Sequence, residues 1–533
     1  MPEESSPNSG GDRSTPAQRS RIVTRRWFMA KAVGWLGTLG LAGLVGYEWP
    51  RTAKRLTEVA PDYRAISEMR SFVSRPDLRP PVVRITTRRS SASPTSKYHQ
   101  PRFIFITPRS VAKTPSQPGL MILNRHGRLI WFNPILTETP FDFNVQNYQG
   151  QPHLTWFQGE VTKGVGAGIG AIANNAYQTI ETIHAGNGLE ADLHELLITT
   201  AGTALITAYE ETTADLSILG GPRQGKVLAS HAQEIDLASG KVLFDWNSLD
   251  HVGVDESYAT APSDKNLPFD YFHINSICET PDGNLLISAR HTWALYKVDR
   301  SSGQIIWRMN GKRSDFSMSP GASFHWQHDA RMPEPTMLTV FDDGSNGSLL
   351  GAEKRSRALV LSVNTEAMDV KLEHAYVHPA GFIAASQGSV RLLPDGRVFV
   401  GWGSQPYFSE FAPDGTLLLD GQLPRSMSSY RAFTHDWVGH PTEPPSIAVR
   451  ANSAGGAMIY ASWNGATEIE SWTVLAGKDE SSLRTVGSQK WSNFETDIAV
   501  NSMGPHFRVA AMDNNGKELG RSEIVKLDVT TIS

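Results

Sequence analysis

Three histidines occupy the same position in three repeated segments of the chain. They are His194 in DLHELLITTAGTALITAY, His273 in HINSICETPDGNLLISAR and His328 in QHDARMPEPTMLTVFDD. Aligned on their turns, all three segments place the histidine at the beginning of a stretch with strand character. A lone histidine on a strand is usually structural, whereas three at equivalent positions indicate that they share one site.

Two kinds of chemistry fit such a set of histidines. Imidazole is a common metal ligand, and the same positions offer further polar groups at Asp192, Asn275 and Gln387. Alternatively, histidines and an arginine clamp a sulfate or a phosphate and transfer it. The available arginines are Arg290, Arg313 and Arg357. A structural ion pair is the more common role for Arg290 or Arg313 taken singly, so both chemistries stay open on the residues alone.

The elements that position these residues are short strands. Residues 270–311 read as four strands, because β-branched, aromatic and leucine residues alternate with turn residues such as Pro281-Asp282-Gly283. The expected strands are His273–Glu279, Asn284–Arg290, Trp293–Val298 and Gln304–Met309. A four-stranded antiparallel meander of about forty residues is one blade of a β-propeller.

Similar hairpins recur along the chain. They are expected at 142–157, Asp192–Tyr209, Gln327–Asp343 and Ser386–Gly403, with weaker copies at Ser446–Trp463 and Thr496–Asp513. We therefore expect an all-β fold, a six- or seven-bladed propeller of four-stranded antiparallel blades. The first residues of each blade's first strand then line the mouth of a central funnel. The glycine-rich stretch Lys163–Gly170 lacks the context of a nucleotide-binding loop and is interpreted as a flexible insert near the site.

Composition excludes several classes of function. The chain has 533 residues and a net charge of −4, which gives no indication of nucleic-acid binding. Cys278 is the single cysteine, so the chain has no intramolecular disulfide and no cysteine-based zinc site. On its strand we expect a buried structural thiol.

The N-terminal part suggests export. Residues 1–20 are expected to be a disordered cytoplasmic tail, and residues 21–50 a twin-arginine-like signal or membrane anchor, because Arg25-Arg26 precede the apolar run 32–47. This run is short for a bilayer span and no cleavage motif follows, so a retained anchor is favoured. Residues 51–80 are interpreted as a tether and 81–533 as the propeller, on the extracytoplasmic side.

Several motifs in order resemble the arylsulfotransferase family, in the branch shared by actinobacterial-type and fungal proteins. They are DLHE (192–195), HINS (273–276), SARH (288–291), WRMNGK (307–312), WQHDAR (326–331), FDDGS (341–345), SRAL (356–359), QGSVRLLPDG (387–396), GWGSQPYFSEF (401–411) and SYRAF (429–433). The resemblance covers residues from about 70 to about 520.

This resemblance implies a propeller that moves sulfate from one phenol to another without a nucleotide or any other cofactor, through a sulfated histidine. It places His273, His328 and Arg357 at family site positions: His273 on a sulfuryl oxygen or the leaving phenolate, the other two on the charge of the sulfuryl group. No later histidine lies in a matching motif. His378 is our candidate nucleophile, with His194 as a further option, and Asp192, His194, Asn275, Arg290 and Gln387 are expected to bind substrate.

The resulting hypothesis is an exported, membrane-anchored aryl sulfotransferase acting on a small aryl sulfate and a phenol. Two rivals remain. One is a binding propeller of the same family that lacks the nucleophile. The other is a metal-dependent hydrolase or lyase that uses the histidine ring.

Overall fold

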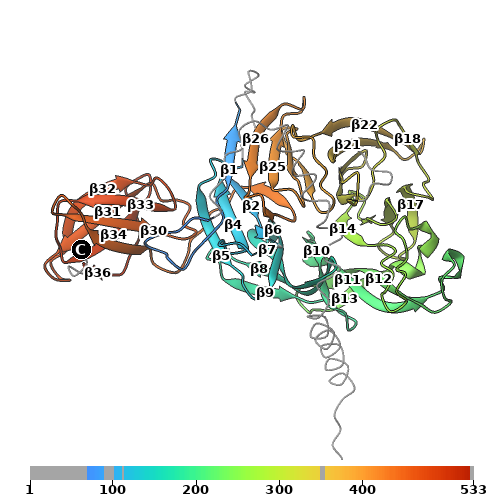
Figure 1. The fold of residues 1–533 in the computed structure, drawn as a ribbon, viewed down its shortest axis with the longest axis horizontal. Helices are drawn as coiled ribbons and strands as arrows, with labels where there is room; N and C mark the ends of the chain where they lie inside the picture. Colours follow the sequence, from blue (N-terminus) through green and yellow to red (C-terminus); the bar gives the residue numbers. More distant parts are fainter. Residues whose placement is uncertain (1–68, 89–100, 111–112, 348–354, 528–533) are drawn as a thin grey trace, which may run out of the picture. The chain divides into compact units, whose positions relative to one another are not determined.

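The computed structural model of the protein describes residues 69–88, 101–110, 113–347 and 355–527. Within these ranges the chain is almost entirely β, and six blades surround a common centre (Figure 1). The described part contains no α-helix. Its three short 3-10 helices are η1 (Ser217–Leu219), η2 (Ser248–Asp250) and η3 (Val254–Glu256).

The blades follow one another in sequence, and each is given from its innermost strand outward. Blade 1 consists of β28 (Ala432–His435), β2 (Phe103–Ile106), β4 (Gly119–Asn124) and β5 (Leu129–Pro134). Blade 2 consists of β6 (Thr139–Tyr148), β7 (Gln151–Thr162), β8 (Val165–Ala173) and β9 (Thr179–Ile183). Blade 3 consists of β10 (Ala191–Ile198), β11 (Thr203–Ala214), β12 (Gly225–Asp236) and β13 (Val242–Asn247).

The second half of the ring is built in the same way. Blade 4 consists of β14 (Ile274–Glu279), β15 (Leu285–Ala289), β16 (Ala294–Val298) and β17 (Ile305–Asn310). Blade 5 consists of β19 (His328–Glu334), β20 (Met337–Asp342), β21 (Arg357–Asn364) and β22 (Asp369–Tyr376), with β18 (Ser317–Met318) parallel to β22. Blade 6 consists of β23 (Ser389–Leu392), β24 (Val398–Gly401), β25 (Tyr407–Phe411) and β26 (Leu417–Gln422), with β1 (Arg84–Thr87) outermost.

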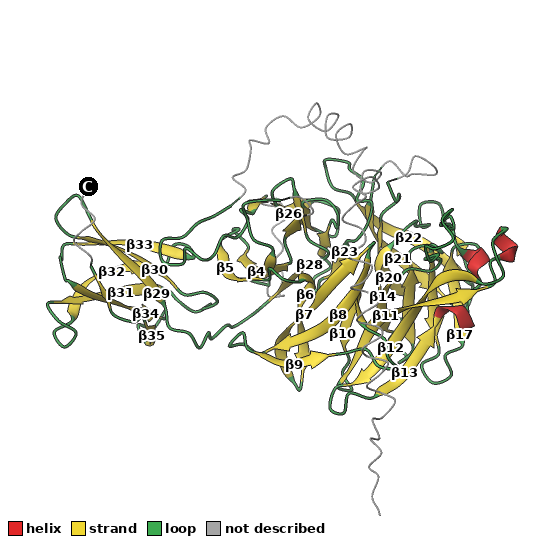
Figure 2. Cartoon of the chain, turned by 60° about the horizontal axis from the view of Figure 1, so that its bottom comes forward, coloured by secondary structure: helices red, strands yellow, loops and turns green. Residues whose placement is uncertain are grey.

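The ring closes through blade 1, which combines strands from both ends of the propeller. β28 pairs antiparallel with β2, so that Phe103 faces His435 across more than three hundred residues of chain. A second contact joins β3 (Arg109–Ser110) to β27 (Met427–Ser428). Closing a sheet ring in this way satisfies edge hydrogen bonds that would otherwise be exposed. Figure 2 shows the strands in yellow and the short helical segments in red from another side.

The predicted propeller is confirmed, and the blade used to recognise it has the expected four strands, each within one residue or so of the predicted limits. Its strands bury apolar side chains on both faces, as adjoining blades require. Ile274, Ile287 and Tyr296 pack toward blade 3, while Leu286 and Leu295 pack toward blade 5. Cys278 is buried in the latter core, as predicted.

The glycine-rich stretch was interpreted as a flexible insert, and this is wrong. Most of it forms strand β8, paired along its length with β7. A Cβ on Gly168 would lie 2.2 Å from the carbonyl oxygen of Gln158, so glycine is needed for the close strand approach. The expected location is right, because a Cβ on Gly164, in the β7–β8 turn, would lie 3.8 Å from Cε1 of His273.

Residues beyond the ring form two further sheets, not additional blades. One consists of β29 (Ser446–Ala451), β30 (Ala457–Ser462) and β33 (Glu495–Val500). The other consists of β32 (Arg484–Lys490), β31 (Ser471–Gly477), β34 (His506–Met512), β35 (Glu518–Arg521) and β36 (Val525–Lys526). They share one core that includes Trp472, Ile498 and Phe507, the arrangement of a β-sandwich.

The prediction that the propeller extends to residue 533 is therefore corrected, and so are the two weaker hairpin copies. The hairpin at 446–463 exists but belongs to the sandwich, and β33 and β34 lie in different sheets. A hairpin of a sandwich has the same alternation and turn glycines as a hairpin of a blade, so the pattern does not distinguish them.

The expected cytoplasmic tail and membrane anchor, residues 1–50, lie outside the described residues. Of the expected tether 51–80, the described part packs on the propeller, since Leu78 is buried beside Ile104. No helix within the described ranges is long and apolar enough to span a bilayer.

Candidate active site

The structure brings the predicted histidines to the beginnings of three consecutive innermost strands. His194 lies in β10, His273 immediately precedes β14, and His328 begins β19. The rings of His194 and His273 are 4.9 Å apart, and His291, at the end of β15, lies 4.7 Å from His273. We call His194, His273, His291, His328 and Arg290 the histidine cluster.

Each of the three predicted histidines is oriented by a carboxylate. The Nδ1 atoms lie 2.5 Å from Asp192 Oδ2 for His194, 2.5 Å from Asp270 Oδ2 for His273, and 2.6 Å from Asp343 Oδ2 for His328. A carboxylate that accepts from Nδ1–H fixes the tautomer and leaves Nε2 with its lone pair. The cluster therefore repeats one His–Asp unit in three adjacent blades.

The three Nε2 atoms differ in what they meet. That of His328 accepts the backbone N–H of Gln387 at 3.2 Å. Those of His194 and His273 have no hydrogen-bond partner among the described residues, and neither is among the buried polar atoms that lack one, so each reaches solvent-accessible space. His194 and His273 are consequently the two histidines available for chemistry.

Their carboxylates also differ. Asp192 accepts from the backbone N–H of Gly166 at 2.6 Å, from Thr207 Oγ1 at 3.0 Å and from His194. Burial alone would raise the pKa of Asp192, but His194 and these hydrogen bonds outweigh it and hold the pKa below its usual value. Burial raises the pKa of Asp270. Asp192 is therefore the better counter-charge for a cationic imidazole.

Burial keeps His273, His291 and His328 neutral. Burial, with help from neighbouring His194 and Arg290, lowers the pKa of His273 well below its ordinary value, and the same factors act on His328. Burial lowers the pKa of His291 to about 3. Neutral imidazoles act as nucleophiles and bases, which is the form the site needs.

Asp270, His273 and His291 have ligand atoms within 4.8 Å of one another and are the one candidate metal set among the described residues. Their hydrogen bonds do not favour a cation. The Nδ1–H of His291 donates to the Asp270 carbonyl at 2.6 Å, and its Nε2 accepts from Arg290 Nη1 at 3.1 Å. Both nitrogens of His291 thus have hydrogen-bond partners and neither is free to bind a metal. The guanidinium of Arg290, held beside His291, places a positive charge there, which favours an anion over a cation.

Arg290 is the arginine of the cluster. Apart from His291, it donates to the carbonyl of Ala385 at 2.8 Å, and its guanidinium lies 5.1 Å from the ring centre of Trp326. A guanidinium carries five N–H donors. Its Nε is buried without a partner, so most of its donors are left for a ligand.

Arg357 lies elsewhere than predicted. It binds Asp342 through Nε at 2.9 Å and donates to the carbonyls of Gly321 and Ser323 at 3.1 Å. Asp342 ends β20 and binds Arg357, whereas the next residue, Asp343, binds Nδ1 of His328. The guanidinium of Arg357 is thus committed to Asp342 and ties β21 to the 321–323 loop, which does not support its predicted role on the sulfuryl group.

His378 cannot be the nucleophile in this arrangement. Its Nδ1 accepts the backbone N–H of Ala380 at 3.1 Å, so the proton is on Nε2, which lies 3.1 Å from Asp420 Oδ1. The ring is buried against Phe382 and Tyr407. Without a free lone pair, His378 is a structural residue of blade 6, and the sequence-based assignment is corrected.

Asn275 and Gln387, predicted to bind substrate, both lie beside the cluster. Asn275 donates to the carbonyl of Gln327 at 2.7 Å, and its Oδ1 is buried without a partner, as is Oε1 of Gln387. Gln387 has φ of 71° and His273 has φ of 56°. Left-handed backbone is costly for side chains other than glycine and is found at functional sites. The binding role itself stays a prediction.

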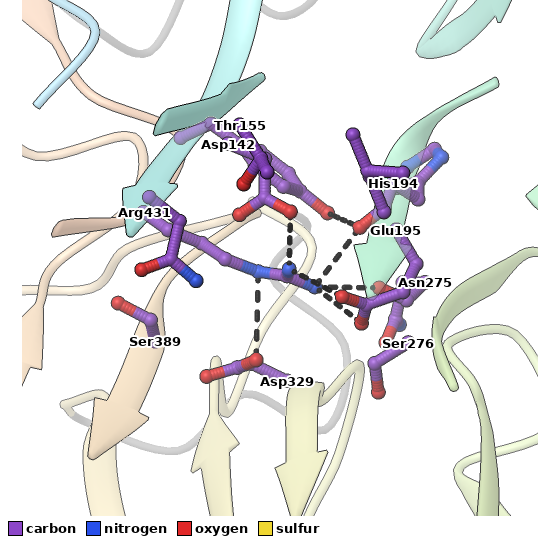
Figure 3. A network of polar contacts seen from close by, with 12 residues as sticks. Asp142, Thr155, His194, Glu195, Asn275, Ser276, Asp329, Ser389 and Arg431 are labelled. Carbon is purple, nitrogen blue, oxygen red and sulfur yellow. Dashed lines mark hydrogen bonds and ion pairs between the residues drawn. The ribbon is translucent and has the colours of Figure 1, made fainter. Parts of the chain in front are cut away.

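A second polar group lies along the same innermost strands, and we call it the ion network: Asp142, Glu195, Asp329, Arg331, Arg391 and Arg431. Figure 3 shows Asp142, Glu195 and Asp329 around Arg431. Arg431 binds Asp142 at 2.9 Å and both oxygens of Glu195 at 3.2 Å. It also donates to the carbonyls of His194 and Asn275.

The remaining arginines complete the charge balance. Arg331 binds Glu195 at 2.5 Å and Asp329 at 2.7 Å, and Arg391 binds Asp329. Three cations thus match three anions. Burial alone would raise the pKa of Asp329, but the two arginines hold it below its usual value, whereas burial raises the pKa of Asp142 to about 6.

Sequence reasoning missed this network, although five of its six residues, all except Asp142, lie inside the motifs DLHE, WQHDAR, QGSVR and SYRAF. The signal was present as charged residues in otherwise apolar innermost strands, such as Asp329 and Arg331 in β19. Asp142, Glu195, Asp329, Arg391 and Arg431 come from five blades, so the network joins the ring at its centre. Several of the motif residues that carry the resemblance therefore have a structural role in this protein.

Fold and site define a six-bladed propeller with a cluster of carboxylate-oriented histidines and an arginine at the start of its inner strands. The family model for arylsulfotransferase (ASST) matches residues 144–423, more than half of the chain. The chain belongs to this family, and at family level it is an aryl sulfotransferase. The predicted family is thereby confirmed.

Solved structures offer only distant likenesses. A protein of unknown function from Bacteroides caccae has 11% identity and a TM-score of 0.38, covering 62% of this chain and 98% of its own. A Lactobacillus plantarum protein has 14% identity and a TM-score of 0.35, covering 74% and 98%. An inactive variant of virginiamycin B lyase from Staphylococcus aureus has 11% identity and a TM-score of 0.29, covering 73% and 96%. No curated protein matches the chain.

Proposed function

We propose that the protein moves a sulfuryl group from an aryl sulfate to a phenol, with His194 as the covalent carrier and no nucleotide cofactor. The observation that carries this proposal is the juxtaposition of two carboxylate-oriented histidines, His194 and His273, whose Nε2 atoms have no partner among the described residues, with an arginine that has unused donors. Family membership supports the reaction class. Hydrogen bonding favours His194 over His273 as carrier, because Asp192 is held ionised beside it.

In the first half-reaction the lone pair on His194 Nε2 attacks sulfur, and the bond between sulfur and the aryl oxygen breaks. The phenolate leaves with the bonding pair. The positive charge that develops on the imidazole is matched by Asp192, 2.5 Å from Nδ1. Arg290 donates to the sulfuryl oxygens and counters the charge spread over them.

In the second half-reaction an acceptor phenol gives its proton to Nε2 of His273, and the phenol oxygen attacks sulfur. The N–S bond breaks and His194 recovers its lone pair. Because His273 is neutral and oriented by Asp270, it serves as the general base here. Run in reverse, the same proton returns to the phenolate of the donor.

A coupled assay tests this proposal. With a chromogenic aryl sulfate, phenolate release should be slow alone and should accelerate when a second phenol is added, with the sulfated second phenol found by mass spectrometry. Absence of both turnover and transfer over a panel of donors would favour the binding propeller of the same family. Turnover that depends on added divalent metal would favour the hydrolase.

The proposal extends to the cellular location. We expect folded export and a retained anchor over residues 32–47, supported by Arg25-Arg26 ahead of a short apolar run. Replacing both arginines with lysine should keep the protein in the cytoplasm, as fractionation would show. Unchanged export would contradict the twin-arginine route, and full solubility of the exported protein would contradict the anchor.

A further inference from the structure

An aromatic series leads away from Arg290 toward the surface. Trp326 lies beneath the Arg290 guanidinium, Trp293 contacts Trp326 edge to face at 5.4 Å, and Tyr258 stacks on Trp293 at 3.6 Å. Exposure rises along this series, from 8% for Trp326 to 36% for Tyr258. One end of the series is thus at the anion-binding arginine and the other is in solvent.

Two features set these rings apart from core packing. Trp293 and Trp326 have φ of 53° and 58°, a conformation that is a true outlier for bulky side chains and persists only where the surroundings enforce it. The indole Nε1 of Trp293 and the Nδ1 of His325, whose rings are 4.7 Å apart, are both buried without a partner. Unsatisfied buried polar atoms are costly unless a ligand completes them.

The loop that carries Tyr258 is fastened in place. The backbone N–H of Tyr258 donates to the His291 carbonyl at 2.7 Å, and Lys312 donates to the carbonyl of Ser257 at 2.6 Å while lying 4.9 Å from the Tyr258 ring. Tyr258 is therefore held over Trp293 and is connected to the cluster through its neighbour His291. An aromatic ligand lying along Trp326 and Trp293 would therefore have one end next to Arg290.

We propose that Trp326, Trp293 and Tyr258 form the aryl subsite of the enzyme and select planar, fused-ring aryl sulfates that carry a hydrogen-bonding substituent. This inference rests on the proposed function for the identity of the anion. The sulfate binds Arg290, the ring system lies along the indoles, and the substituent meets Trp293 Nε1 and His325 Nδ1. Stacking on aromatic side chains favours extended rings over single rings and over alkyl chains.

Binding of sulfonates tests this subsite without requiring turnover, because the sulfur of a sulfonate is bonded to carbon and its group is not transferred. Titration calorimetry would compare 6-hydroxynaphthalene-2-sulfonate, benzenesulfonate and butanesulfonate. We expect the naphthalene to bind about tenfold more tightly than butanesulfonate, with benzenesulfonate between them. Equal affinity for all three would overturn the proposal.

Variants separate the subsite from the anion site. Trp326→Leu should remove most of the preference for the naphthalene and leave butanesulfonate binding unchanged, whereas Trp326→Phe should keep it. Arg290→Gln should weaken all three sulfonates alike. A Trp326→Leu protein that folds with native circular dichroism and keeps the full preference would contradict the subsite. If Arg290→Gln leaves all affinities unchanged, the anion site fails and the proposed function fails with it.

Discussion

The histidine cluster and the ion network occupy successive levels of the same innermost strands, and they use charge in opposite ways. In the ion network three arginines face three carboxylates and the opposite charges pair with one another, although Asp142 Oδ1 and Arg431 Nε are buried without a hydrogen-bond partner. In the histidine cluster Nε2 of His194, Nε2 of His273 and three of the five N–H groups of Arg290 have no hydrogen-bond partner among the described residues. Adjacent residues of one strand belong to the two levels: His194 lies in the histidine cluster and Glu195 in the ion network, and the same holds for His328 and Asp329.

This difference teaches which buried polar groups to regard as functional. A burial or charge criterion selects both levels, since Glu195 and His194 are equally buried. The arrangement of the charges separates them. In the ion network each charged group lies against an opposite charge, which stabilises the fold, whereas in the histidine cluster Nε2 of His194 and of His273 has no partner among the described residues and is left for a ligand. Variants at the two levels should therefore fail in different measurements.

The largest effect is expected at the network. Arg431→Leu leaves Asp142 and Glu195 buried with a reduced set of counter-charges, and removing one partner of a buried pair costs about 3–5 kcal/mol. Urea unfolding should show this loss in the free energy of unfolding, with the exposed Arg484→Leu as the matched control. A variant as stable as the wild type would mean that the network is not closing the ring.

The next effect belongs to the cluster and should appear in rate rather than stability. Arg290→Gln removes donors directed at the sulfuryl oxygens, and such contacts are typically worth ~10²–10³ in turnover. The free energy of unfolding should change less than in Arg431→Leu, because Arg290 makes only two hydrogen bonds to protein groups and no ion pair with a carboxylate within 4 Å among the described residues. Arg290→Lys should recover part of the rate, since an ammonium cannot make a two-pronged contact with two oxygens. Normal turnover in Arg290→Gln would remove Arg290 from the site.

Asp142 gives the comparison a pH signature. Its pKa is raised from 3.8 to about 6 by burial, so the folded state holds a proton that the unfolded state releases between pH 4 and pH 6. By linkage, stability due to this group falls as pH rises through that window, by up to about 3 kcal/mol. The difference in unfolding free energy between wild type and Asp142→Asn should shift in that direction. A pH-independent difference would contradict a proton on Asp142.

The smallest effect expected is at Arg357, and it reverses the sequence-based prediction. Because its guanidinium binds Asp342 and two loop carbonyls, Arg357→Gln should cost about 1–3 kcal/mol of stability. Turnover per folded molecule, measured by active-site titration with an aryl sulfate, should be nearly unchanged. A loss of ~10² in rate at normal stability would return Arg357 to the funnel.

The sequence was sufficient for the propeller and for the position of the cluster, because alternation and turn residues fix the register of each hairpin, and register fixes which side chains reach the centre. It was insufficient for Arg357 and His378. The side chain of Arg357 is held by Asp342 and by a loop that precedes its blade's inner strand, and that of His378 is held by Asp420 of blade 6. Such tertiary contacts decide where each side chain lies, and the strand pattern does not contain them.

The sandwich and β8 were missed for a related reason. Gly166, Gly168 and Gly170 resemble a flexible loop in isolation, and only the partner strand and the nearby Leu193 and Leu196 show why side chains are excluded there. Likewise, β33 pairs with β30 and β34 pairs with β31. The alternation that predicts a hairpin between two consecutive strands gives no information on such non-local pairs. What the sequence lacks in both cases is the identity of the facing strand.

The central claim is that the histidine cluster carries the sulfuryl group, on His194. Incubation with an aryl sulfate alone, followed by rapid quenching at high pH and peptide mapping by mass spectrometry, should place a sulfuryl group on His194. His194→Asn should abolish the adduct, and the exposed His440→Asn should not. An adduct on His273, or on no histidine in an enzyme that still transfers sulfate, would contradict the account.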